Sequence, residues 1–454
     1  MKKSCNDSIF AQLIRLALPV IGGSFMSMAY SFVNMLFVGK LGADSVAAVG
    51  SAGFFINLGW ALSSLITVGV GIKVSHANGA GNKVLAKSFV LNGKIALIVL
   101  AILYLSVLMF GGKYLISILN LKNQQVEALS IGFLIRSGWS IPFTFLNNFY
   151  SSVFIGYGNS RIPFRISSLG LLLNILLDPI AIFGFGLGIN GAAYATILSQ
   201  MITVFLYSRK LRLLQGDVDQ RISYQKAQLR ELLLLGMSPT LQRMVFVFIA
   251  IGMARIISNW GTEAIAVQKV GVQIEALSYM TISGFTSALS SIAGKAYGAK
   301  DYVRQWKSFL AGLTIAMVVG LTTTVVFMAF PEPLFSLFLR DSESLRLGKD
   351  YLVILAYSQL FMCIELLSTG AFYGWGKTYL PAIISITLTS ARIPLAYILT
   401  TCCSPTLNTI WWCISLSSMA KGLLLTGLFF LLFQLFMKTQ TVTDGKKECQ
   451  CTGG

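Results

Sequence analysis

Long apolar runs constrain this chain more than any other feature of its sequence. Runs of 18 or more apolar residues recur from near the first residue to position 437 of the 454. A membrane helix needs about 20 such residues, and only helices or closed barrels satisfy their backbone hydrogen bonds in lipid. The runs predict an all-α membrane protein with twelve transmembrane helices, over residues 10–38, 46–72, 88–110, 129–157, 163–187, 190–208, 229–257, 270–294, 307–330, 350–373, 379–400 and 408–437.

The composition leaves little room for a soluble domain. Hydrophobic residues make up 55% of the chain and charged residues 11%, against about 25% charged residues in soluble proteins. The sequence contains no P-loop, zinc-protease or kinase signature, and its seven cysteines have neither disulfide nor zinc spacing. We therefore expect no enzyme activity, no cofactor and no metal centre.

The net charge of +18 has a topological explanation. Basic residues gather in the segments after the second, fourth, sixth and eighth predicted helices: Lys73, Lys83, Lys87, Arg161, Arg165, Arg209, Lys210, Arg212, Arg221, Lys226, Arg230, Lys295, Lys300, Arg304 and Lys307. Because short basic loops stay in the cytoplasm, we expect cytoplasmic termini and a multi-pass protein of the cell (inner) membrane. Its expected partners are the lipid bilayer and small molecules, and not nucleic acid, and we expect a monomer.

The chain repeats itself after about half its length. Four pairs of similar segments lie 218–220 residues apart: ALPVIG and GMSPTL, KLGADSVAAVG and NWGTEAIAVQKVG, NGAGN and YGAKD, and GYGNSRIP and GWGKTYLP. Six helices per copy keep both copies in one orientation, which predicts two six-helix bundles related by pseudo-two-fold symmetry about the membrane normal. We place the bundles at 1–208 and 229–438, a cytoplasmic linker at 209–228 and a disordered cytoplasmic tail at 439–454. Substrates of such repeats bind near the midplane, between the halves.

A single carboxylate, Asp178, stands in the apolar run LGLLLNILLDPIAIFGFGL. A charge at the bilayer centre costs roughly 2.5–3.5 kcal/mol, so it is usually functional. Asn174 lies four residues earlier, on the same helix face. Pro179 follows and cannot donate to the carbonyl of Ile175. A carboxylate, an amide oxygen and a freed carbonyl together predict a cation or proton site in a transporter.

The order of these motifs resembles the multidrug and toxic compound extrusion (MATE) family. FVGKLGADSVAAVG is followed by NGAGN, GYGNSRIP and LNILLDP…FGFGLGINGAAYAT, and YGAKD and GWGKTYLP recur in the second half. The likeness covers nearly the whole chain. It implies two six-helix bundles in a V shape that export organic cations or drugs in exchange for Na⁺ or H⁺.

The resemblance also implies a set of site residues. The family's amino-terminal cation site has an acid on the first helix, amides or hydroxyls on the fourth and fifth, an acid on the fifth and a threonine on the sixth. Asn174, Asp178 and Thr196 match this pattern. Asn34 stands where the family usually has aspartate, so the site carries one negative charge where two are usual. The fourth helix offers three candidates: Asn147, Asn148 and Ser151.

Two acids of the second half are candidates for substrate binding or proton relay. Glu275 is expected near the start of the helix predicted at 270–294, where the alternative is a residue near the membrane surface. Glu365 is expected in the middle of the helix at 350–373. Arg392 corresponds to Asn174 in the repeat. Because an unpaired buried charge is costly, we expect Glu365 to form an ion pair with Arg392, with Arg243 as the alternative partner.

These observations favour a secondary antiporter that works by alternating access, with Na⁺ or H⁺ as the coupling ion. One alternative is a flippase for lipid-linked saccharides or related amphipathic precursors. Such proteins tend to have arginine-rich cavities, whereas the charge of the first half here is acidic. A second alternative, a membrane scaffold or receptor, gives no reason for Asn174, Asp178 and Thr196 to converge.

Overall fold

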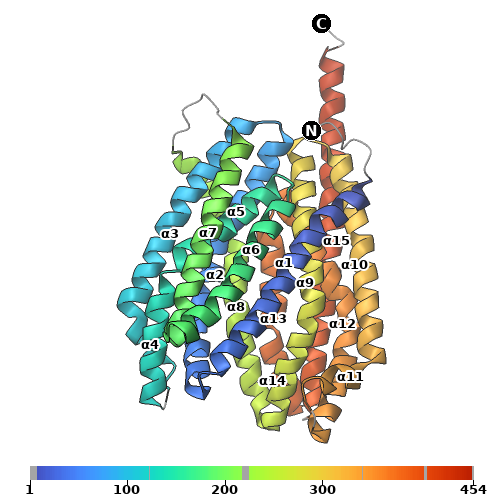
Figure 1. Ribbon diagram of the computed structural model, residues 1–454. Coiled ribbons are helices and arrows are strands. Elements are labelled where there is room, and N and C mark those ends of the chain that lie inside the picture. The colour runs from blue at the N-terminus through green and yellow to red at the C-terminus, as the bar shows by residue number, and fades with distance from the viewer. Residues whose placement is uncertain (1–7, 122, 217–223, 340, 403–405, 452–454) are drawn as a thin grey trace. The chain divides into compact units, whose positions relative to one another are not determined.

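The computed structural model describes residues 8–121, 123–216, 224–339, 341–402 and 406–451 (Figure 1). Within these ranges every regular element is helical, which confirms the all-α prediction. The first copy of the repeat comprises α1 (Ile9–Gly39), α2 (Ala43–Gly79), α3 (Lys83–Ile118), α4 (Gln124–Gly138), α5 (Ile141–Gly156), α6 (Arg161–Pro179), the π-helical turn η1 (Ile180–Gly184) and α7 (Ile189–Gln215).

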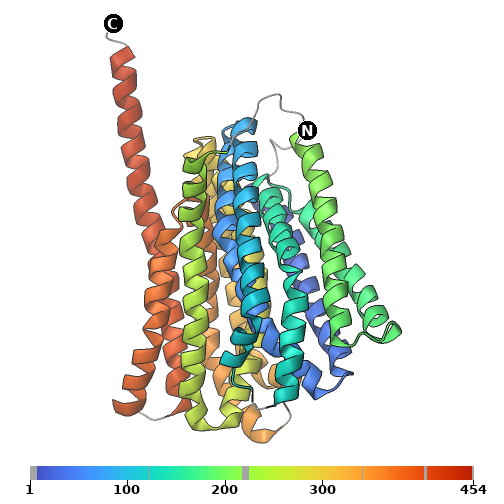
Figure 2. The ribbon, with the colours of Figure 1, turned by 90° about the vertical axis from the view of Figure 1, so that its left-hand side faces the viewer.

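The second copy follows the same order. It comprises α8 (Lys226–Ile257), the 3₁₀ turn η2 (Ser258–Trp260), α9 (Thr262–Gly298), α10 (Tyr302–Ala329), α11 (Pro331–Ser336), α12 (Ser342–Trp375), α13 (Tyr379–Ser390), α14 (Arg392–Cys402) and α15 (Leu407–Cys451). Figure 2 shows α15 extending past the other helices of its unit, so it is longer than the helix predicted at 408–437. The predicted linker at 209–228 is helical up to Gln215 and again from Lys226, and its residues 217–223 lie outside the described ranges.

Length and composition fit a multi-pass membrane protein. Ten of the described helices are long and apolar enough to cross a membrane, or up to eleven if the pair α4 and α5 forms one span bent by 49°. Helix α9 has 37 residues but is rich in serine and threonine and less apolar. All twelve predicted helices have a helical counterpart, and three of the twelve are interrupted: between α4 and α5, at η1, and between α13 and α14.

The repeated motifs form the same turns in both copies. Helix α2 begins at Ala43 and α9 at Thr262, 219 residues later. The motifs NGAGN and YGAKD each end in a residue that caps the next helix: Asn82 accepts from the Leu85 amide and Asp301 from the Arg304 amide, both at 2.9 Å. The two copies therefore share helix boundaries as well as similar sequence motifs.

The described residues divide into two compact units, and each has its own core. One unit is Ile14–Met244, and its core contains Phe145, Phe149, Phe154 and Tyr207, all fully buried. The other comprises the chain up to Leu13 and from Val245 onward, with a core around Tyr351 and Trp411, whose rings meet edge to face. We call these the first unit and the second unit.

The start of α8 belongs to the first unit, where it packs closely on α2. A Cβ on Gly69 would lie 2.4 Å from the Leu232 carbonyl oxygen, and one on Gly236 would collide with the carbonyl of Leu65. Small residues permit such close backbone approach between membrane helices. The division between the units therefore falls inside α1 and α8, not in the segment 209–228.

Candidate functional site

Asp178 lies in the interior of the first unit, one residue before the end of α6. Its side chain is fully buried, and that of Asn174 is 4% exposed. The two side chains share one helix face because residues four apart are neighbours on a helix. Pro179 cannot donate to the carbonyl of Ile175, and the chain passes directly into η1. Regular α-helical hydrogen bonding therefore ends immediately after the carboxylate.

The amide of Asn174 links Asp178 to α7. With its nitrogen directed at the carboxylate, Nδ2 lies 2.8 and 3.1 Å from the two Asp178 oxygens. Oδ1 then accepts from the hydroxyls of Thr196 at 3.2 Å and Ser199 at 3.0 Å. This orientation gives each amide atom partners of the opposite polarity. The structure thus brings together Asn174, Asp178 and Thr196, as the sequence predicts, and adds Ser199.

Helix α1 contributes Tyr30, which the sequence argument missed. Its hydroxyl lies 3.3 Å from Asn174 Oδ1, beside Asp178 and Thr196. The available signal was its spacing: Tyr30 precedes Asn34 by four residues and shares its helix face. Asn34 Oδ1 itself is buried and has no hydrogen bond partner among the described residues. Its place in the site stays a prediction.

We call Asp178, Asn174, Thr196, Ser199 and Tyr30 the carboxylate cluster. The three candidate residues on α5 form hydrogen bonds with other partners. Asn147 accepts from Thr203 at 3.0 Å, Asn148 donates to a hydroxyl on α2 at 3.4 Å, and Ser151 hydrogen bonds with Tyr207. None of the three has a described hydrogen bond to the cluster.

Asp178 has no cationic partner among the described residues. The described ion pairs join Lys73 to Glu231, Arg346 to Glu343, Lys349 to Glu332 and Lys421 to Glu365. Within the described residues none involves Asp178, whose recorded hydrogen bonds come from a neutral amide. A buried carboxylate without a fixed cation is costly when ionised. Within the described residues, no side-chain cation therefore balances the charge of an ionised Asp178.

Glu365, on α12 in the interior of the second unit, does have a cationic partner. Its Oε2 lies 3.0 Å from Lys421 Nζ on α15, and Ser385 donates to Oε1 at 3.0 Å. The side chains of Glu365 and Lys421 are 7% and 8% exposed. The expected pair with Arg392 is wrong, since no described ion pair joins those residues. Helix α15 packs along α12, which α13 follows directly in sequence. The signal in the sequence was Lys421, a lone charge in the apolar run MAKGLLLT.

Arg392 instead binds hydroxyls of α15. It is the first residue of α14, at the break after α13. Nε donates to Ser417 at 2.6 Å, and Nη2 donates to Ser418 at 2.9 Å and to the Ile414 carbonyl at 3.4 Å. The guanidinium is thus fixed by three acceptors on a single helix.

Glu275 lies well inside α9, not near the start of its helix as predicted. Helix α9 begins at Thr262, more than three turns earlier. Oε1 of Glu275 accepts from the Tyr351 hydroxyl at 2.6 Å, and Arg392 is close enough to interact electrostatically. In the second unit the acids at 275 and 365 therefore each lie near a basic side chain.

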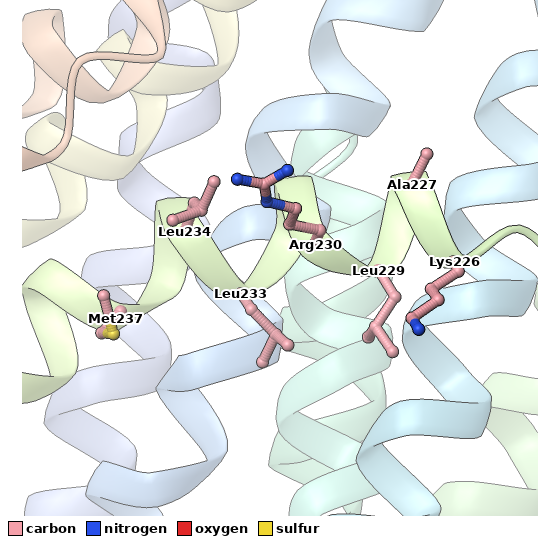
Figure 3. Close-up of a pocket in the computed structure, with 7 residues that line it drawn as sticks. All are labelled: Lys226, Ala227, Leu229, Arg230, Leu233, Leu234 and Met237. Carbon is pink, nitrogen blue, oxygen red and sulfur yellow. The ribbon is translucent and has the colours of Figure 1, made fainter.

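A groove runs along the first turns of α8. It has a volume of about 530 Å³ and is lined by Lys226, Ala227, Leu229, Arg230, Leu233, Leu234 and Met237. Figure 3 shows Leu229 and Leu233 on one side of α8 and Arg230 and Leu234 on the other. No residue of the carboxylate cluster lines it.

Comparison with known proteins identifies the family and similar chains. The profile of the MatE family matches residues 19–180 and 240–398. The probable multidrug resistance protein NorM of Thermotoga maritima is 28% identical over 404 residues, covering 86% of this chain and 85% of that protein. The probable multidrug resistance protein YoeA of Bacillus subtilis is 27% identical, covering 88% of each chain.

A solved structure, described as MATE in the bent conformation, superposes with a TM-score of 0.90 at 22% identity, covering 96% of this chain and 98% of that one. The likeness in fold thus extends over almost the full length of both proteins. The profile match covers both copies of the repeat, including α6 with Asn174 and Asp178. This chain therefore belongs to the multidrug and toxic compound extrusion family of membrane transporters.

Proposed function

We propose that this protein is a secondary antiporter that exports organic cations in exchange for a cation or proton bound at Asp178. The observation that carries the proposal is the carboxylate cluster: a fully buried aspartate with no described ion pair. Members named multidrug resistance proteins support drugs as the cargo. The antiporter would lie in the cell membrane with both termini in the cytoplasm, as the basic loops indicate.

The cluster has the chemistry that a coupling ion needs. Na⁺ is a hard cation that takes carboxylate, amide and hydroxyl oxygens, and the cluster supplies oxygens from Asp178, Asn174, Thr196, Ser199 and Tyr30. A proton needs only the carboxylate. Either ion would neutralise a charge that lipid disfavours by roughly 2.5–3.5 kcal/mol.

Coupling follows if ion and substrate prefer different packings of the helices. A ligand shifts a conformational equilibrium only by its differential affinity for the two states. The cluster joins α1, α6 and α7, so a change in how these helices meet changes the number of oxygens around the ion. The ion would thereby favour the packing that closes the cluster, and substrate would favour the other.

The test is efflux of a fluorescent organic cation from proteoliposomes under separately imposed Na⁺ and H⁺ gradients. Wild-type protein should respond to at least one gradient, and Asp178→Asn should abolish gradient-driven efflux while its melting temperature in detergent changes little. Asp44→Asn is the matched control, because Asp44 is an exposed residue in the first turn of α2. Full gradient-driven efflux by Asp178→Asn would refute the proposal.

A further inference from the structure

The ammonium of Lys421 is held by the same two kinds of group that bind organic cations. Glu365 supplies a buried carboxylate at 3.0 Å. Phe246 supplies an aromatic ring whose centroid lies 5.7 Å from Nζ. A carboxylate attracts any cation, and an aromatic face favours alkylated or lysine ammonium groups. Phe246 is half-buried, whereas the two charged side chains are buried.

The repeat shows that the fold does not require charges at these positions. Asn147 and Thr203 lie 218 residues before Glu365 and Lys421. They form a neutral hydrogen bond of 3.0 Å, the same length as the ion pair. Helices α5 and α7 of the first unit are therefore joined by an amide and a hydroxyl where α12 and α15 of the second unit are joined by two ions.

Neighbouring contacts confirm that the two positions are equivalent. The hydrogen bond between Tyr150 and Ser208 is 3.0 Å long, and that between Ser368 and Thr426, 218 residues later, is 2.9 Å long. The spacing is the same, so the helices meet in the same register. Since burying two ions costs more than burying a neutral pair, the charges at 365 and 421 call for a functional explanation.

We propose that Lys421 is a tethered competitor that occupies a second-unit binding site for the ammonium group of an organic cation. The site is the Glu365 carboxylate with the Ser385 hydroxyl and the Phe246 ring. A substrate cation binds by displacing Nζ from the carboxylate. The inference rests on the proposed export of organic cations and names where their charge binds. Alkali ions, which gain little from the ring, displace Lys421 poorly.

The first experiment restores the missing group with a small molecule. Lys421→Ala removes three methylenes and the ammonium, which together are the size of n-propylammonium. In detergent, propylammonium chloride should raise the melting temperature of Lys421→Ala by several degrees, with NaCl and n-propanol as controls. Wild-type protein should show no such shift. Lys377→Ala should show none either: Lys377 lies 3.7 Å from the Trp375 centroid but has no described carboxylate partner.

The second experiment removes the competitor and then the site. Affinity for ethidium, measured by fluorescence titration in detergent, should rise about tenfold in Lys421→Ala, and propylammonium should compete with it. The variant Glu365→Asn/Lys421→Thr copies the neutral pair of the first unit. It should fold and should lose at least tenfold in ethidium affinity. If Lys421→Ala does not fold, the ethidium affinity of the double variant alone tests the proposal.

Wild-type ethidium affinity in the double variant would overturn the proposal, as would a propylammonium shift of equal size in wild type, Lys421→Ala and Lys377→Ala. Both experiments measure binding and not transport. A failure of Asp178 coupling in proteoliposomes would therefore leave their outcome unchanged, and the two proposals can fail separately.

Discussion

Two buried acids, Asp178 and Glu365, show how the surroundings of one residue set its role. Asp178 has a neutral amide partner on its own helix, whereas Glu365 has a lysine on another helix. Removing one member of a buried ion pair leaves the other charge unpaired and costs about 3–5 kcal/mol. Neutralising an acid with no fixed cation carries no such cost. Neutralising Asp178 should therefore cost less stability than neutralising Glu365.

Tyr30→Phe tests the contribution of α1 to the carboxylate cluster. The variant loses a hydroxyl 3.3 Å from Asn174 Oδ1, and a hydrogen bond of this kind contributes about 1 kcal/mol. We expect the coupling-ion concentration for half-maximal efflux to rise several-fold, with a small change in melting temperature. Tyr194→Phe is the control, because Tyr194 is 47% exposed on α7. Identical ion titrations of the two variants would exclude Tyr30 from the site.

Arg392→Lys tests whether the several hydrogen bonds that the guanidinium donates at once contribute to stability. Lysine cannot reproduce donors to Ser417, Ser418 and the Ile414 carbonyl at once. We expect a loss of about 1.5–3 kcal/mol, as for hydrogen bonds from charged groups, seen as a lower melting temperature in detergent. Arg346→Lys should change little, because the Arg346–Glu343 pair is exposed. Equal effects at 392 and 346 would contradict this account.

At the scale of elements, the helix boundaries are the most strongly duplicated feature. The turn between α2 and α3 has Gly81 at φ 70°, and its counterpart between α9 and α10 has Lys300 at φ 57°. Left-handed backbone costs a residue with a Cβ roughly 1–2 kcal/mol. The second copy thus adopts the same conformation with a lysine in place of glycine, next to the capping residue Asp301.

Lys300→Gly should therefore stabilise the protein by up to about 1 kcal/mol. Gly81→Ala should destabilise it by a similar amount through the backbone alone, since a Cβ there would contact nothing within 4 Å. Gly111→Ala has the same open surroundings but lies inside α3, where alanine is favoured by about 1 kcal/mol. The melting temperature in detergent should rise for Lys300→Gly and Gly111→Ala and fall for Gly81→Ala. A fall for Lys300→Gly would show that Lys300 has another role.

At the scale of the whole molecule, the compact units do not coincide with the two copies of the sequence. The start of α8, the first helix of the second copy, supplies partners to buried polar groups of the first unit. Gln228 bonds to Ser88 at 2.8 Å and Asn92 at 3.0 Å, and Thr240 bonds to Ser64 at 2.8 Å. A buried polar group left without its partner costs about 1–3 kcal/mol.

A fragment of residues 1–261 should consequently aggregate less in detergent than a fragment of residues 1–216. The longer fragment keeps Gln228 and Thr240, and the shorter one exposes Gly69 and leaves buried hydroxyls and amides unpaired. We expect a single symmetric peak in size-exclusion chromatography for 1–261 and aggregation for 1–216. Equal behaviour would mean that the first unit is complete without α8.

The order of the helices, the repeat, and the pair Asn174 and Asp178 on one face of α6 could be predicted from the amino-acid sequence alone. These depend on the length of apolar runs and on four-residue spacing, which are local properties. The contact of Tyr30 with the carboxylate cluster and the ion pair of Glu365 with Lys421 instead of Arg392 became visible only in the three-dimensional arrangement of the helices. Such contacts depend on how each helix is rotated against its neighbours. That rotation is set by the packing of many side chains at once, and neither spacing nor repeat offset specifies it.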